Sequence, residues 1–114
     1  MNERKRSRLS GDIRRILEET IIRDVSDDRL QNVLITRVKL ARDGSHATVF
    51  FETTGSETDS EEACTAMKSA GGFLRSRLAD TIRMRTVPIL SFVHDSSGKD
   101  GDKVLGIIKN LESD

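Results

Sequence analysis

The 114-residue sequence contains one cysteine, one proline, no tryptophan and no tyrosine. The single thiol, Cys64, excludes both an intramolecular disulfide framework and a multi-cysteine zinc site. No apolar run approaches the roughly 20 residues that a membrane-spanning helix needs. The basic start of the chain also leads into no apolar stretch of the kind found in secretory signals. We therefore expect a soluble cytoplasmic protein that has no membrane partner.

Although aromatic residues are few, the aliphatic residues suffice for a small core. Leu, Ile, Val and Phe together make up 30 residues, which is about a quarter of the chain. This share lies above the rough 20% below which charged chains tend to stay disordered. The length corresponds to one domain. We expect this domain to span residues 1–114, with flexible ends at 1–3 and 112–114.

The net charge is zero, but the charged residues are distributed in alternating blocks. Residues 1–42 and 67–94 each carry an excess of four positive charges, whereas 43–66 carry an excess of six negative charges and 95–114 an excess of two. If the two basic blocks meet in space, one side of the molecule attracts phosphate. Arginine outnumbers lysine by 13 to 6, and its planar guanidinium binds phosphate bidentately and stacks on bases. Each block taken alone also fits an ordinary solvated surface.

The hydrophobic periodicity of residues 4–23 predicts an amphipathic helix. Its apolar stripe consists of Leu9, Ile13, Ile16, Leu17, Thr20 and Ile21. At about 100° per residue, Arg4, Arg8 and Arg15 project almost opposite that stripe. We therefore expect this helix to bury one face and to expose arginines on the other.

Three strands are predicted further along the chain. Residues 34–40 and 46–52 alternate between inward and outward positions, and the Asp43-Gly44 pair between them favours a tight hairpin. Residues 89–93 follow Pro88 and are fairly apolar on both faces, which is typical of a central or parallel strand.

Residues 59–83 are predicted to be helical with an interruption. Thr58 and Glu61 have the spacing of a capping box, so the helix is expected to begin after Thr58. The adjacent Gly71 and Gly72 disfavour a straight helix, so we expect two short helices or one kinked helix. A last apolar stripe, which contains Val104, Ile108 and Leu111, predicts a C-terminal helical segment.

No catalytic or metal-binding pattern is present in the sequence. His46 and His94 have no neighbouring Cys or carboxylate pattern that implies a triad or a metal site. Cys64 lies beside small apolar residues and is interpreted as a buried hydrophobe. The loop at 95–102 lacks the ligand spacing of a calcium loop and the residues of a phosphate-binding P-loop. We expect no enzymatic activity, no metal, no cofactor and no small-molecule substrate.

The order helix, strand, strand, helix, helix, strand, together with the arginine faces, suggests an α+β fold of the type II KH-like αββααβ kind. In such a fold the helices pack on one face of a three-stranded sheet. KH domains usually clamp RNA with a Gly-x-x-Gly loop between two helices. Here Gly98-Lys99-Asp100-Gly101 follows the third strand and is interpreted as a turn. The helix junction has Ala70-Gly71-Gly72 instead.

A KH-like chain in which an Ala-x-Gly kink replaces the clamp resembles the ribosome-binding factor A family of bacterial small-subunit assembly factors. The resemblance covers nearly the whole chain. The motifs that carry it are Asp27-Asp28-Arg29-Leu30, Leu34-Ile35-Thr36-Arg37-Val38, Arg42-Asp43, Ala47-Thr48-Val49-Phe50, Ala70-Gly71-Gly72-Phe73-Leu74-Arg75, Arg83-Met84-Arg85-Thr86-Val87-Pro88-Ile89-Leu90-Ser91-Phe92 and Asp95-Ser96-Ser97. Two positions depart from the family pattern: Asp28 replaces the usual proline and Ile89 the usual glutamate.

The resemblance implies a non-catalytic assembly factor, expected as a monomer. It would bind the immature small (30S) ribosomal subunit and its 16S rRNA and promote late maturation and rRNA processing. A generic single-stranded RNA-binding KH-like module, not tied to the ribosome, is the alternative. A third interpretation is a protein-interaction domain whose arginines only solubilise it.

The candidate RNA-binding residues are all arginines: Arg4, Arg8, Arg15, Arg42, Arg75, Arg83 and Arg85. Asp43 and Asp95 match aspartates of the family, but both also suit turns and loop caps. For Arg42 we weigh function and turn structure equally. At the kink formed by Ala70, Gly71 and Gly72, we expect Gly72 to be sensitive to substitution and Gly71 to be tolerant.

Overall fold

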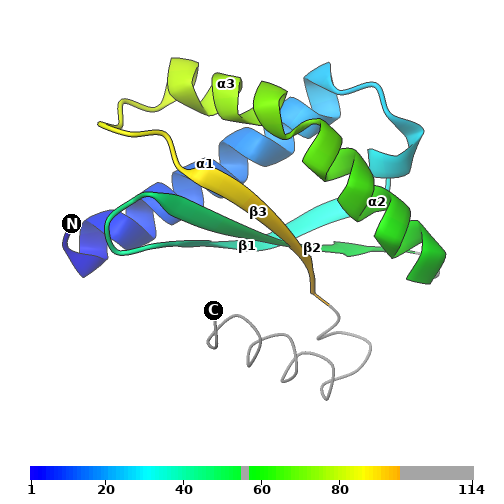
Figure 1. Cartoon of the computed structure of the whole chain (residues 1–114), viewed down its shortest axis with the longest axis horizontal. Helices are drawn as coiled ribbons and strands as arrows, with labels where there is room; N and C mark the ends of the chain where they lie inside the picture. Colours follow the sequence, from blue (N-terminus) through cyan, green and yellow to red (C-terminus); the bar gives the residue numbers. More distant parts are fainter. Residues whose placement is uncertain (55–56, 96–114) are drawn as a thin grey trace.

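The computed structural model describes residues 1–54 and 57–95. They form helices and strands in the order expected for an α+β fold (Figure 1). The elements are α1 (Glu3–Asp24), the short 3₁₀ helix η1 (Asp28–Leu30), β1 (Val33–Leu40), β2 (His46–Thr53), α2 (Glu57–Ser69), α3 (Gly71–Thr81) and β3 (Ile89–His94). The predicted C-terminal helical segment and the Gly98–Gly101 turn lie outside the described residues.

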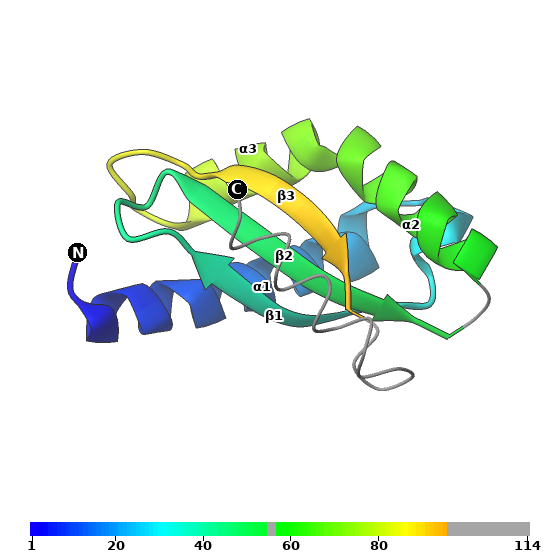
Figure 2. The ribbon, with the colours of Figure 1, turned by 60° about the horizontal axis from the view of Figure 1, so that its bottom comes forward.

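The three strands form one sheet in the order β1-β2-β3, with the helices on one face (Figures 1 and 2). β1 and β2 pair antiparallel through the predicted hairpin, and β2 and β3 pair parallel. The parallel pairing predicted for residues 89–93 is confirmed, but a central position is wrong because β2 lies between the other two strands. Because β3 is at the edge of the sheet, its apolar residues are not all covered, and Ile89 is 56% exposed.

The predicted face of α1 is the buried face. Leu9, Ile13, Ile16, Leu17 and Ile21 all belong to the hydrophobic core, and Ile13 and Leu17 are completely buried. Thr20 is buried on the same face, where its hydroxyl donates a 2.7 Å hydrogen bond to the Ile16 carbonyl. At the start of the helix, the Asn2 side chain caps α1 by accepting a 2.8 Å hydrogen bond from the backbone N–H of Lys5. Asn2 and Glu3 are therefore part of the helix start.

β1 contains one residue more than the stretch of β2 with which it pairs. Ile35 lies opposite Phe51 and Arg37 opposite Phe50, so Thr36 forms a β-bulge. The Thr36 hydroxyl lies 3.2 Å from the Phe50 carbonyl and 3.1 Å from Oδ2 of Asp95. The backbone N–H of Asp95 also donates to the Phe51 carbonyl. The chain that leaves β3 is thus held against β1 and β2.

α2 and α3 are joined by a bend with no loop. Ala70 is their only linking residue and has right-handed helical angles, φ −82° and ψ −3°. Hydrogen bonds run through the bend, from Ala70 N–H to the Ala66 carbonyl and from Leu74 N–H to the Ala70 carbonyl. The predicted break is confirmed, but the predicted cap at Thr58 is wrong because α2 already begins at Glu57. In the part of the chain that the structure describes, no helix is long and apolar enough to span a membrane.

Candidate nucleic-acid interface

Three segments that are far apart in the sequence meet at one end of the molecule. They are the start of α1, the hairpin turn after β1 and the loop of residues 82–88 (Figure 1, left). The surroundings of Gly44 in the turn show that the three segments are in contact. A Cβ added to Gly44 would lie 3.2 Å from the side-chain methyl of Met1 and 4.0 Å from that of Met84. Gly44 has a φ of 76°, a conformation that glycine adopts without strain.

This convergence brings basic side chains from all three segments together. We call this surface the basic end; it consists of Arg4, Lys5, Arg8, Arg42, Arg83 and Arg85. All six side chains are exposed. Within residues 1–54 and 57–95, none of them forms an ion pair with a carboxylate. Their charge is therefore not neutralised locally, and such a cluster attracts polyanions. Sequence reasoning missed Lys5, which follows Arg4 and has the same exposure.

Three other arginines of α1 have acidic partners on the same helix. Arg6 pairs with Glu3, Arg14 with Glu18 at 3.2 Å, and Arg15 with Asp12 at 3.4 Å. Arg15 is exposed, as expected from its position opposite the apolar stripe. It follows Arg8 by seven residues, about 10 Å along the helix axis. The structure therefore does not bring Arg15 into the basic end.

Arg75 has a different role from the other candidate arginines. Its Nε donates a 3.2 Å hydrogen bond to the Pro88 carbonyl, and its Nη2 donates a 2.9 Å hydrogen bond to the Val87 carbonyl. Both acceptors belong to the loop that carries Arg83 and Arg85. Arg75 thus fixes this loop to α3, and its donors at these two positions are already used.

The two candidate aspartates hold local structure. Oδ1 of Asp43 accepts hydrogen bonds from the backbone N–H of Ser45 at 3.0 Å and from the Ser45 hydroxyl at 2.6 Å. These bonds lower the pKa of Asp43 below its ordinary value, the side-chain bond more than the backbone bond. Asp95 is bound by Thr36 across the sheet. Both observations favour the turn-forming and loop-capping interpretations, whereas the Arg42 side chain is exposed and has no ion pair with any described residue.

Neither glycine after the bend requires the conformational freedom of glycine. Gly71 and Gly72 lie in the first turn of α3, and neither has a positive φ. A Cβ on Gly71 would lie 3.9 Å from the Phe92 ring, an ordinary contact, and one on Gly72 would meet nothing within 4 Å. In the free protein, the structure therefore gives no steric reason for the predicted sensitivity of Gly72 to substitution. Any sensitivity of Gly72 has to come from a partner that approaches its exposed backbone.

The described residues contain a basic surface but no group of three or more His, Cys, Asp or Glu side chains that could hold a metal ion. An α+β sheet with helices on one face and a bent helix pair are the features of a KH-like protein, and among the described residues this one carries exposed arginines without acidic partners.

Comparisons with known proteins identify the family. The family model described as "Ribosome-binding factor A" matches residues 5–108. The chain is 34% identical to ribosome-binding factor A of Syntrophomonas wolfei, over 100% of this chain and 95% of the relative. It is 36% identical to that of Carboxydothermus hydrogenoformans, over 96% of this chain and 88% of the relative. The chain therefore belongs to the ribosome-binding factor A family, as the resemblance of its motifs implied.

Solved structures of this family have the same fold. The crystal structure of ribosome-binding factor A from Thermus thermophilus superposes with a TM-score of 0.71 at 32% identity, covering 78% of this chain and 93% of that one. A homology model of the Thermus thermophilus protein, fitted into a cryo-EM map of a 30S complex, gives a TM-score of 0.68 at 31% identity. It covers 82% of this chain and 99% of the other.

Proposed function

We propose that this protein is a non-catalytic ribosome assembly factor of the cytoplasm. It binds the immature small (30S) subunit through 16S rRNA and promotes late maturation and rRNA processing. Membership of the ribosome-binding factor A family supports this proposal, as does the Thermus thermophilus relative, which was fitted into a map of a 30S complex.

The observation that carries the proposal is the basic end. Arg4, Arg8, Arg42, Arg83 and Arg85 come from three segments and lack acidic partners among the described residues. They are the candidate phosphate contacts, with Lys5 beside them. Arg75 contributes by holding the loop on which two of them lie. Arg15 is a weaker candidate because Asp12 already pairs with it.

Sedimentation of the tagged protein through a sucrose gradient of cell lysate tests the ribosomal part. We expect the protein to sediment with free small subunits and to be absent from 70S particles. A generic single-stranded RNA-binding module would instead be distributed over all RNA in the lysate. In a competition assay, purified small subunits would then displace it no better than an unstructured RNA of equal mass. A protein-interaction domain would show little salt dependence in either assay.

The salt dependence of subunit binding tests the phosphate contacts. Each neutralised phosphate contributes roughly 0.7–0.9 to the slope of log K against log salt. Contacts by all six residues of the basic end therefore predict a slope of about −4 to −5. A slope near zero would contradict the assignment of this surface to RNA.

A further inference from the structure

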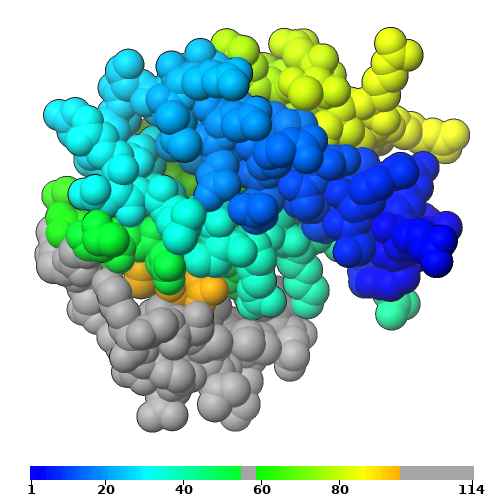
Figure 3. Space-filling view, turned by 180° about the vertical axis from the view of Figure 1, so that it is seen from behind, coloured from blue at the N-terminus to red at the C-terminus, as the bar shows by residue number. Residues whose placement is uncertain are grey.

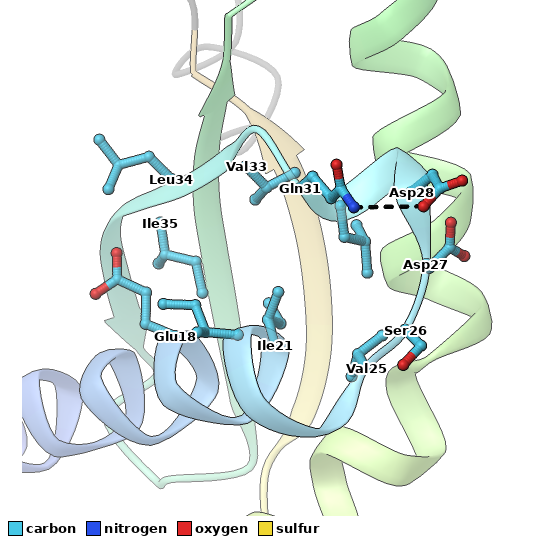
Figure 4. A pocket seen from close by; sticks show the side chains of 12 residues that line it. Glu18, Ile21, Val25, Ser26, Asp27, Asp28, Gln31, Val33, Leu34 and Ile35 are labelled. Atoms are coloured by element: carbon cyan, nitrogen blue, oxygen red, sulfur yellow. Dashed lines mark hydrogen bonds between the residues drawn. The ribbon is translucent and has the colours of Figure 1, made fainter.

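A groove lies away from the basic end, between the second half of α1, η1 and the start of β1 (Figure 4). It has a volume of about 640 Å³. Ile21, Ile35 and the aliphatic part of Glu18 face one another across it, and η1 closes one side (Figure 4). No residue of the basic end lines this groove, so the assignment of that surface to RNA leaves the groove unexplained.

Two large apolar side chains at the groove are exposed to solvent. Ile22 on α1 is 81% exposed and Leu34 on β1 is 51% exposed, and both line the groove. Only four large apolar residues of the described chain are at least 51% exposed. Two of them at one groove form an apolar surface that water solvates poorly, which is typical of a contact site.

The charge around these apolar side chains is negative. Glu18, Asp27 and Asp28 line the groove, which contains no Lys or Arg in its lining. Glu18 and Asp27 have the ion-pair partners Arg14 and Arg29, whereas Asp28 receives only a 3.4 Å hydrogen bond from the Gln31 amide.

Two further carboxylates extend this negative rim. Glu19 is exposed one turn before Ile22 on α1, and Glu52 lies opposite Leu34 in the ladder between β1 and β2. These five carboxylates outnumber the three nearby arginines, Arg14, Arg23 and Arg29, so the rim keeps a net negative charge that attracts lysine and arginine.

The backbone of β1 adds a third feature. β1 is an edge strand, and no described strand pairs with its outer side. Three consecutive β1 residues, Val33, Leu34 and Ile35, line the groove. An edge strand can pair with an extended segment of another chain, whose alternate side chains then point into the adjacent groove.

From these three features we infer that the groove binds an extended basic segment of another protein, in which lysine or arginine alternates with aliphatic residues. Its backbone pairs with the edge of β1. Its aliphatic side chains contact the exposed Ile22 and Leu34, and its cationic side chains reach the carboxylates on the rim. The groove and the basic end are separate, so the protein binds this segment and RNA at the same time. The inference does not depend on the identity of the RNA.

Fluorescence anisotropy with a labelled ten-residue peptide of alternating Lys and Leu tests this inference on the full chain. Leu34→Ser and Asp28→Lys should each weaken binding at least fivefold. Both side chains are exposed, so the fold should persist, which circular dichroism can confirm. Ile89→Ser and Asp80→Lys are the matched controls, because they make the same kinds of change at exposed sites away from the groove; they should leave binding unchanged.

Two further peptides separate the contributions of charge and apolar contact. A Glu-Leu peptide and a Lys-Ser peptide of the same length should each bind at least tenfold more weakly than the Lys-Leu peptide. The amide NMR signals of Val33–Ile35 should shift on binding, because the peptide pairs with this edge. Equal binding of the three peptides, or equal losses in the groove variants and their controls, would overturn the inference.

Two alternative occupants give distinct results. If a peptide with the sequence of residues 96–114 binds the groove more tightly than the Lys-Leu peptide, the groove belongs to this chain itself and the inference is wrong. A dimer in sedimentation velocity that dissociates on Leu34→Ser would equally overturn it, in favour of a second copy. A monomer that binds the Lys-Leu peptide best supports it.

Discussion

At the basic end, cationic side chains from three separate segments lie together without acidic partners among residues 1–54 and 57–95. The segment around η1 (cyan) lies on the other side of the molecule from the start of α1 (dark blue), as Figure 3 shows. There, the Asp27 and Arg29 charges pair within one short chain segment. Asp27 accepts hydrogen bonds from the backbone N–H, Nε and Nη2 of Arg29. These bonds lower the pKa of Asp27, the side-chain bonds most strongly.

The difference between the two ends separates charges that shape the protein from charges that are available to a partner. The Asp27–Arg29 pair stabilises the turn into β1, so these two charges act within the protein. Charges on the basic end have no comparable ion pairs among the described residues, and under the proposed function they contact rRNA phosphate. Four predictions test this distinction, in order of decreasing expected effect.

The largest effect is expected from charge reversal at the basic end. Arg8→Glu combined with Arg85→Glu removes two phosphate contacts and adds repulsion. We expect tenfold to hundredfold weaker small-subunit binding at physiological salt, and a salt slope smaller by about 1.5. A filter-binding titration at several salt concentrations measures both quantities.

The matched control for this variant is Arg15→Glu with Arg23→Glu. It makes the same change in charge on exposed α1 residues outside the basic end, so it should weaken binding by a clearly smaller factor. An equal loss of subunit affinity in the two double variants would show that only the overall charge matters, and would contradict a special role for the basic end.

The second prediction concerns Arg75, which holds local structure but acts on the loop that carries two residues of the basic end. Arg75→Ala removes the two hydrogen bonds to the Val87 and Pro88 carbonyls, so we expect a loss of about 1 kcal/mol in unfolding free energy. Subunit binding should weaken as well, because the loop that carries Arg83 and Arg85 is no longer fixed.

Urea unfolding and the salt slope together distinguish positioning from direct contact by Arg75. If Arg75 only positions the loop, the salt slope of Arg75→Ala stays near that of the unmodified protein. A slope that falls by about 0.8 without any loss of stability would instead make Arg75 a phosphate contact.

The third prediction is a gain in stability. Gly72→Ala adds a methyl group that meets nothing within 4 Å, in a helix where alanine is preferred to glycine. The unfolding free energy should rise by about 0.5–1 kcal/mol. Weaker subunit binding by this stabilised variant would place Gly72 at the RNA surface, whereas a lower melting temperature would show that the bend does require glycine.

The smallest effect is expected from Asp43→Asn. The folded-state pKa of Asp43 lies below its ordinary value of 3.8, so the ionised form stabilises the folded protein above that pH. This stabilisation disappears as the pH falls through the lowered folded-state pKa. Asp43→Asn should therefore melt slightly earlier than the unmodified protein at pH 7, and the two melting curves should converge in strong acid. A difference that persists at low pH would show that the carboxylate charge is not the cause.

The sequence predicted those parts of the fold that follow from local pattern. The apolar stripe of α1 and the Asp43-Gly44 turn depend only on residues close in the chain, and both are confirmed. The wrong cap at Thr58 and the wrong central position of β3 have a common cause. Helix starts and strand order depend on tertiary packing, which a short motif does not encode.

The candidate site was predicted in part, for a related reason. The pattern identified exposed arginines but could not show which of them find partners. Arg75 bonds to carbonyls 12 and 13 residues away, and Arg15 pairs with Asp12 on the same helix. Local sequence pattern did not predict the groove. Its walls come from α1, η1 and β1, whose arrangement becomes visible only in the fold.

Because of the bulge at Thr36, the number of residues in β1 affects the direction of the strand. Deleting this one residue would leave a regular ladder, with Ile35 still able to face Phe51. It would also remove the extra twist that a bulge introduces into its strand. Without this twist, residues 33–35 would take a different direction relative to β2, while the hairpin at the other end of β1 would stay in place. Insertions and deletions at Thr36 therefore change the groove wall formed by residues 33–35 and the Thr36–Asp95 hydrogen bond, but not the position of the basic end. The groove and the basic end can thus diverge independently during evolution.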